Sequence, residues 1–128
     1  MYLMPKILVV DDHEMAGKAA TRTVGRAGYE TRLVLDPQGA LNLIEQGEYK
    51  PELILCDMMM PGMTGLDLLR KLRERGDKTP LIFLSGQMDD DLEDRIQEAI
   101  ANDVAQGFLR KPWDPDDLLP KIRSLIGR

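Results

Sequence analysis

Acidic, hydroxyl and amine side chains follow separate apolar runs of this 128-residue chain, each at the point where a run ends. Four of the five runs end in this way, with Asp11 and Asp12, Asp57, Ser85 and Lys111. Each residue alone has an ordinary explanation as a strand end, a turn residue or a surface lysine. Because the carboxyl ends of parallel strands meet at one edge of a sheet, we expect all five side chains to lie close together.

The chemistry of such a group is that of phosphoryl transfer. Three carboxylates in one crevice repel one another, and Mg²⁺ (or Mn²⁺) would offset that repulsion, because Mg²⁺ prefers oxygen ligands and keeps exchangeable waters. A carboxylate can also attack phosphorus and form an aspartyl phosphate. We therefore expect Asp57 to be the nucleophile, with Asp11 and Asp12 supporting the metal. Lys111 would neutralise charge on the phosphoryl oxygens, and Ser85 would donate a hydrogen bond to one of them.

Alternating patterns predict the strands and helices that position these residues. Strands are expected at 6–10, 29–35, 53–56, 81–84 and 107–110. Helices are expected after Glu14, Asp36, Thr64, Asp89 and Asp114, and three of them end near Gly28, Gly47 and Gly76. Thr64 and Asp67 have the spacing of a capping box. The inner face of the fourth helix is expected to consist of Leu92, Ile96, Ala99, Ile100 and Val104.

Strand and helix alternation of this kind predicts a parallel sheet with helices on both faces. We predict an α/β fold with a flavodoxin-like, doubly wound, five-stranded sheet of order 2-1-3-4-5. This order places the first and third strands side by side at the topological switch point, so Asp11, Asp12 and Asp57 would share one crevice. The second strand is more polar than the others and is expected nearer an edge.

Size and composition predict a single domain spanning 4–128. With 43% hydrophobic and 30% charged residues, the chain has the composition of a soluble globular protein. A net charge of −5 argues against a direct nucleic-acid surface. No signal peptide or membrane span is visible, so we expect a cytoplasmic protein without membrane contact. Cys56, the single cysteine, is expected to pack in a buried strand rather than to react.

Other polar residues have structural explanations. His13 is the single histidine, so no histidine-based metal cluster or catalytic triad is expected, and it is interpreted as a surface or helix-start residue. The acidic run 89–94 is interpreted as the solvated start of a helix, where the helix dipole favours negative charge, and not as a second metal site. Trp113 is expected to anchor the last helix.

Taken together, these motifs resemble the receiver domain of two-component response regulators, the fold family of the chemotaxis response regulator. The resemblance covers the chain from Lys6 to the last helix. The motifs that carry it are Val-Val-Asp11-Asp12, Cys-Asp57-Met-Met-Met-Pro61-Gly62-Met-Thr-Gly65, Leu-Ser85-Gly86 and Leu-Arg-Lys111-Pro112-Trp.

The resemblance implies that Asp57 accepts a phosphoryl group from a sensor histidine kinase or a phosphotransfer protein. It also implies that Asp12, Asp57 and the Met59 backbone carbonyl hold Mg²⁺, with Asp11 supporting the ion mostly through water. Such a domain catalyses only its own phosphotransfer and dephosphorylation, so it is not an enzyme with a separate substrate.

By the same resemblance, Ser85 and Phe108 form a switch pair. Phosphorylation would shift the face made by the fourth helix, fifth strand and fifth helix. That face would control an output domain, C-terminal in the full-length chain, or a separate effector, and it could support a homodimer. Met59 and Gln87 would flank the phosphoryl group and govern access of water.

The sequence departs from the family pattern at three places. Ser85 stands where Thr is common, Phe108 replaces a frequent Tyr, and the interval from Ser85 to Lys111 is a few residues longer than usual. Two other functions remain open. An interaction or dimerisation module with a vestigial pocket would fail to bind Mg²⁺. An aspartyl-nucleophile phosphatase would turn over phosphomonoesters, but Asp11 and Asp12 lack the two-residue spacing usual there. A flavin-binding protein is disfavoured because no glycine-rich phosphate loop follows Val10.

Overall fold

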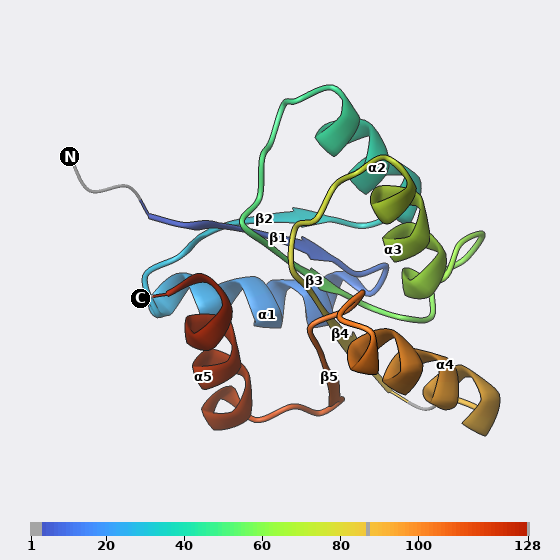
Figure 1. Cartoon of the computed structure of the whole chain (residues 1–128). Coiled ribbons are helices and arrows are strands. Elements are labelled where there is room, and N and C mark those ends of the chain that lie inside the picture. The colour runs from blue at the N-terminus through green and yellow to red at the C-terminus, as the bar shows by residue number, and fades with distance from the viewer. Residues whose placement is uncertain (1–3, 87, 128) are drawn as a thin grey trace.

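The computed structural model describes residues 4–86 and 88–127, in which strands and helices alternate as predicted (Figure 1). The strands are β1 (Lys6–Val10), β2 (Glu30–Val34), β3 (Leu53–Cys56), β4 (Leu81–Ser85) and β5 (Gly107–Arg110). The helices are α1 (Glu14–Arg26), α2 (Pro37–Glu45), α3 (Gly65–Glu74), α4 (Asp90–Ala101) and α5 (Pro115–Ile126).

The five strands form one parallel sheet in the order β2-β1-β3-β4-β5, which confirms the predicted topology. Every residue of β3 and β4 is buried, as expected for strands covered on both faces. β2 lies at an edge and has exposed positions, in agreement with its more polar sequence. No helix among the described residues is long and apolar enough to cross a membrane.

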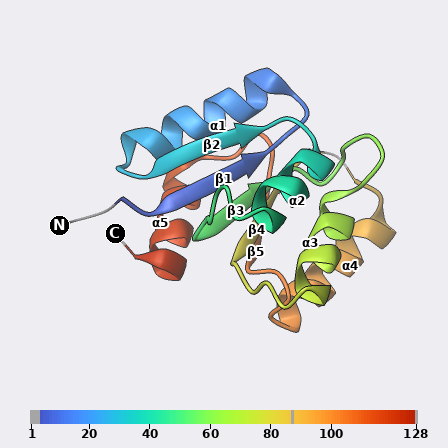
Figure 2. The ribbon, with the colours of Figure 1, turned by 90° about the horizontal axis from the view of Figure 1, so that it is seen from above.

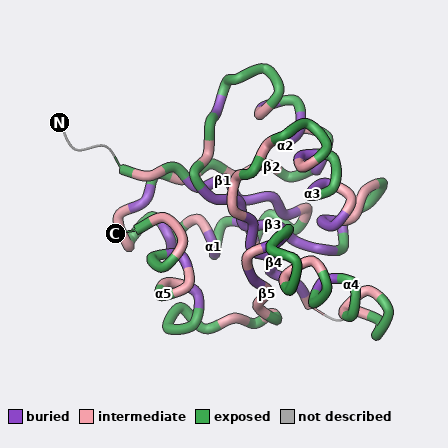
Figure 3. The backbone as a smooth tube through the Cα atoms, viewed as in Figure 1, coloured by how far each residue is buried: buried purple, intermediate pink, exposed green. Residues whose placement is uncertain are grey.

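The sheet separates two helical layers, with α1 and α5 on one face and α2, α3 and α4 on the other (Figure 1, Figure 2). Alternate residues of β1 point to opposite layers, as the two-residue period of a strand requires. Ile7 and Val9 pack with α1 and α5, whereas Leu8 and Val10 pack with α2, α3 and α4. The buried sheet runs through the centre of the molecule (Figure 3). Each buried aliphatic side chain contributes about 1.5–3 kcal/mol, so this double core fixes the sheet edge where the polar residues emerge.

Side-chain caps set the starts of the helices. The Asp36 side chain accepts a 2.6 Å hydrogen bond from the Gly39 amide at the start of α2. Thr64 and Asp67 form the predicted capping box at the start of α3, with reciprocal bonds of 3.0 and 3.1 Å. A box satisfies two amides that the helix itself leaves without partners. These caps hold the loops that lead from the strands into the helices.

The inner face of α4 differs from the prediction. The helix ends at Ala101, and Val104 lies beyond it with 37% of its surface exposed, so placing Val104 on that face was wrong. Asp103 has a left-handed backbone conformation (φ 58°), which ends the helical path before Val104. Ile96 is the buried residue of α4, and its neighbours on that face are partly buried.

Candidate functional site

Two aspartates lie side by side because their strands are paired. Val10 of β1 is in register with Cys56 of β3, so Asp11 and Asp57 follow adjacent strand ends. The Asp57 amide donates to the Val10 carbonyl at 2.8 Å, and this bond continues the ladder up to the site. Both carboxylates are buried, with 4% and 5% exposure for Asp11 and Asp57. Burial of unprotonated carboxylates requires a compensating cation or hydrogen bonds.

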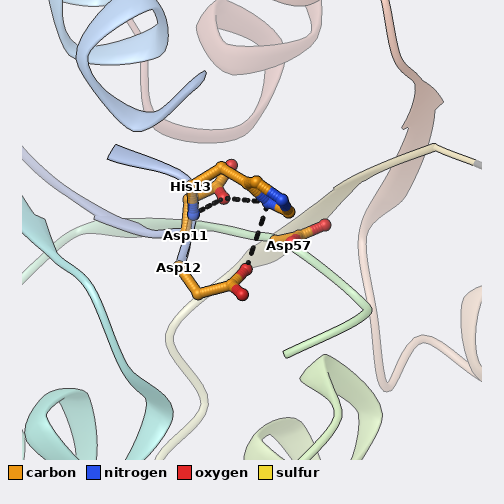
Figure 4. A group of neighbouring side chains, drawn as sticks. All are labelled: Asp11, Asp12, His13 and Asp57. Carbon is orange, nitrogen blue, oxygen red and sulfur yellow. Dashed lines mark hydrogen bonds and ion pairs between the residues drawn. The ribbon is translucent and has the colours of Figure 1, made fainter. Parts of the chain in front are cut away.

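The three aspartates converge with a histidine. One possible ligand atom from each of Asp11, Asp12, His13 and Asp57 lies within 4.8 Å of the other three (Figure 4). The convergence of the three carboxylates in one crevice is therefore confirmed. The buried Asp12 Oδ1 atom accepts no hydrogen bond from the described residues. An inaccessible acceptor without a donor beside two more carboxylates suits a divalent cation that prefers oxygen ligands.

Lys111 reaches the same crevice from the end of β5. Its Nζ lies 2.7 Å from Asp11 Oδ2 and 3.5 Å from Asp57 Oδ1. The Lys111 amide also donates to the Ser85 carbonyl at 2.6 Å, which ties this segment to the end of β4. The ammonium group therefore bridges the two buried carboxylates and offsets part of their repulsion.

Ser85 is fully buried at the last position of β4. Its hydroxyl has no hydrogen-bond partner among the residues that the structure describes. A buried hydroxyl without a partner costs free energy in this state, and a ligand with acceptor oxygens would remove that cost. The structure therefore provides a free donor at the strand next to β3.

The carboxyl group of Asp57 is a weaker acid than usual. Burial raises its pKa, Lys111 lowers it, and the charges of Asp11 and Asp12 raise it, giving a value of about 6. Burial dominates because removing a carboxylate from water disfavours the ionised form. With this pKa, Asp57 is mostly ionised at neutral pH. Burial also raises the pKa of the Cys56 thiol, so this residue is an inert core side chain, as predicted.

Gly65 at the start of α3 was not identified from the sequence as part of the site's support. Its amide donates to the Met58 carbonyl at 2.8 Å. A Cβ atom at this position would meet the Asp57 carbonyl oxygen at 2.5 Å and Phe83 at 3.1 Å. Glycine therefore lets α3 approach the end of β3 closely, and its amide holds the Met58 carbonyl next to Asp57.

A family model described as "Response regulator receiver domain" matches residues 7–123. The chain belongs to this family. It is 33% identical over 123 residues to response regulator MprA of Mycolicibacterium vanbaalenii, an alignment that covers 96% of this chain and 51% of that protein. The chain thus spans about half the length of the curated relatives it matches.

Two solved structures have the same fold. The receiver domain of Francisella response regulator 1452 has 30% identity and a TM-score of 0.81, over 95% of this chain and 96% of that chain. Chemotaxis protein CheY4 of Vibrio cholerae has 30% identity and a TM-score of 0.80, over 96% and 99% of the two chains. The chain is therefore a receiver domain from the regulatory family that serves two-component signalling.

The other residues that the sequence predicts around the phosphoryl group and in the switch have distinct environments. Met59 is 51% exposed in the loop that follows β3. Phe108 of β5 is partly buried, lies in register with Phe83 of β4, and has the Arg110 guanidinium 5.7 Å from its ring centre. Gln87, predicted to flank the phosphoryl group with Met59, lies outside the described residues.

His13 belongs to this cluster, although the sequence analysis predicted no chemical role for it. It is the N-cap of α1 and exposed, as the prediction of a helix-start surface residue requires. However, its Nδ1 atom lies 3.4 Å from Asp12 Oδ1 and 3.8 Å from Asp11 Oδ1. Its position directly after two acidic residues was the sequence feature that could have identified it.

The acidic run 89–94 behaves differently from the cluster at the strand ends. Asp89 caps α4 by accepting a 2.8 Å hydrogen bond from the Leu92 amide. Glu93 pairs with Arg110 at 2.8 Å. Among the described residues, side chains that could bind a metal converge around Asp57 and do not converge in this run.

Proposed function

We propose that this receiver domain is a phosphorylation-controlled switch that accepts a phosphoryl group on Asp57 with the help of Mg²⁺. The observation that carries the proposal is the position of Asp57. Its carboxylate is buried among two further aspartates, with a lysine ammonium 3.5 Å from one of its oxygens. Mg²⁺ would be held by Asp12, Asp57 and the Met59 backbone carbonyl, with Asp11 supporting it through water.

The proposed reaction transfers phosphorus between two nucleophiles. A carboxylate oxygen of Asp57 forms a bond to the phosphorus of a phosphohistidine on a kinase or phosphotransfer protein. The phosphorus–nitrogen bond breaks, and the electron pair remains with the imidazole nitrogen. Bound Mg²⁺ would supply positive charge at the transferring oxygens. The Lys111 ammonium neutralises another part of that charge, and the Ser85 hydroxyl donates to a phosphoryl oxygen.

The proposed switch is supported by the Ser85 hydroxyl, which has no hydrogen-bond partner among the described residues. Once Asp57 carries acceptor oxygens, Ser85 gains a hydrogen bond that it lacks in the structure described here. Movement of Ser85 toward the phosphoryl group would let the Phe108 ring enter the vacated space and shift the surface of α4, β5 and α5. That surface would control a C-terminal output domain, a separate effector or a homodimer. A cytoplasmic location is part of the proposal, and the free, buried Cys56 suits a reducing compartment.

The test uses the purified chain with Mg²⁺ and acetyl phosphate, followed by intact-mass spectrometry. We expect the wild-type protein and Asp89→Asn to gain one phosphoryl group, and Asp57→Asn to gain none. Asp89→Asn is the matched control because it changes an exposed aspartate at another helix start. Labelling that survives in Asp57→Asn would contradict the assignment of the acceptor.

Lys111→Met tests the part played by the ammonium group. We expect slower labelling, because positive charge at the transferring oxygens is lost, together with tighter Mg²⁺ binding, because a competing cation has left the crevice. Intact-mass spectrometry of samples quenched at successive times measures the labelling rate, and calorimetric titration measures the Mg²⁺ affinity. Unchanged labelling would remove Lys111 from the proposed mechanism.

A further inference from the structure

We propose that His13 supplies a nitrogen ligand to the cation site, so that this domain binds Co²⁺, Ni²⁺ or Zn²⁺ more tightly than an all-oxygen site would. The inference rests on the proposed cation site at Asp57 and extends it to the choice of metal. Imidazole suits these ions, whereas carboxylate, carbonyl and water oxygens suit Mg²⁺. His13 would therefore determine metal specificity without being needed for Mg²⁺ binding.

The distances around His13 fit a shared ion. Its Nδ1 atom lies 3.4 Å from Asp12 Oδ1, and the ring is directed toward the carboxylates (Figure 4). Two ligands at about 2.1 Å from one tetrahedral metal are separated by about 3.4 Å. One possible ligand atom each from Asp11, Asp12, His13 and Asp57 lies within 4.8 Å of the other three, so the four gather around one space where an ion could contact several of them.

The His13 side chain is available to bind a metal ion. His13 occupies the N-cap of α1, but its ring makes no capping hydrogen bond. Its backbone amide donates to Asp11 Oδ1 at 2.9 Å, which fixes the residue beside the acids whatever its side chain is. The nearest acceptor, Asp12 Oδ1, is buried and receives no hydrogen bond from the described residues. A metal ion between these two atoms would satisfy that oxygen.

A protonated His13 that simply pairs with the acids would produce the same short distances. Two variants separate the possibilities. His13→Ala removes both the charge and the ligand, whereas His13→Arg keeps a positive charge and cannot bind a metal through nitrogen. Met15→Ala is the matched control, because Met15 is 86% exposed on the first turn of the same helix.

The experiment measures Co²⁺, Ni²⁺ and Mg²⁺ binding by calorimetry on the untagged 128-residue chain. We expect His13→Ala and His13→Arg each to weaken Co²⁺ and Ni²⁺ binding about tenfold or more, with Mg²⁺ binding in His13→Ala unchanged within about twofold. Met15→Ala should match the wild type for all three ions. Equal Co²⁺ affinity in the wild type and His13→Ala would overturn the proposal, as would loss of Mg²⁺ and Co²⁺ affinity by the same factor.

Pulsed EPR of the Cu²⁺-loaded protein gives a direct readout of the ligand. Because the chain contains a single histidine, a coordinated imidazole seen in the spectrum belongs to His13. We expect its nitrogen modulation in the wild type and its loss in His13→Ala; a wild-type spectrum without it would contradict the proposal. These tests do not depend on phosphorylation. If Asp57 is labelled in the presence of Mg²⁺ but the His13 variants bind metals like the wild type, the proposed function stands and only the part of His13 is rejected.

Discussion

Two acidic segments of this protein stand at helix starts and differ in almost everything else. Asp11 and Asp12 precede α1 and, with Asp57, form a largely buried group that the Lys111 ammonium and the His13 imidazole approach. The run 89–94 precedes and begins α4, where most of its carboxylates are exposed. The comparison of these two segments shows that the number of acidic residues alone does not bring metal-binding atoms together. In the proposed cation site, burial of carboxylates against one another creates the demand for a cation, because water no longer solvates their charges.

Loss of a carboxylate at the buried group should have the largest effect. Asp12→Asn removes the charge of a buried oxygen that has no hydrogen-bond donor among the described residues. Because loss of even an outer-shell partner costs about 10–100-fold in metal affinity, we expect Mg²⁺ affinity to fall by about a hundredfold or more. Asp89→Asn should leave the affinity unchanged in the same calorimetric titration. Equal losses in the two variants would remove the contrast between the segments.

The next effect is on stability in the metal-free protein. The pKa of Asp57 rises from 3.8 to about 6 on folding, so the folded state binds more protons than the unfolded state between these values. The contribution of Asp57 to the free energy of unfolding should therefore fall as pH rises through this window. Asp57→Asn should abolish this fall, which we expect to be about 2 kcal/mol.

Urea unfolding in the presence of a chelator, from about pH 4 to about pH 7, measures this dependence. Asp89→Asn is again the control, because it changes an exposed aspartate outside the group around Asp57. A wild-type pH profile that matches the profile of Asp57→Asn through this window would show that burial does not control the ionisation of Asp57.

A smaller effect is expected at the exposed segment. Asp89→Ala removes the cap of α4 and should lower the free energy of unfolding by about 1 kcal/mol. Mg²⁺ affinity should not change. Asp90 follows Asp89 and makes no capping bond among the described residues, so the free energy of unfolding of Asp90→Ala should lie within about 0.5 kcal/mol of the wild-type value. Thermal and urea unfolding of the two variants measure this difference. If Asp89→Ala and Asp90→Ala lower the free energy of unfolding by the same amount, the negative charge at the helix start, and not the capping bond, stabilises α4.

The smallest effect is expected for the ion pair between Glu93 and Arg110. The Glu93 side chain is 36% exposed and the Arg110 side chain is 49% exposed, so solvent screens the attraction between their charges. Glu93→Gln should change the free energy of unfolding by about 0.5 kcal/mol or less. Added salt should reduce even this difference. A change well above 1 kcal/mol would show that this segment shares the strong electrostatics of the buried group.

Local features predicted most of the fold. The start of α3 could be read from Thr64 and Asp67, and the start of α2 from Asp36, because caps and turns depend on neighbours in sequence. Val104 was misplaced because the turn at Asp103 breaks the helical period that the apolar spacing suggested. The close approach at Gly65 was missed since it depends on the Asp57 carbonyl, which lies in a different element.

The amino-acid sequence by itself determined which residues stand at strand ends, and the rules for parallel crossovers then placed Asp11, Asp12 and Asp57 at one edge. Only the tertiary structure decided how deeply each carboxylate is buried, that the Lys111 ammonium touches Asp11 more closely than Asp57, and that His13 joins the group. The physical reason is that strand ends follow from local periodicity, whereas burial and charge separation depend on segments as far apart in the chain as Asp11 and Lys111.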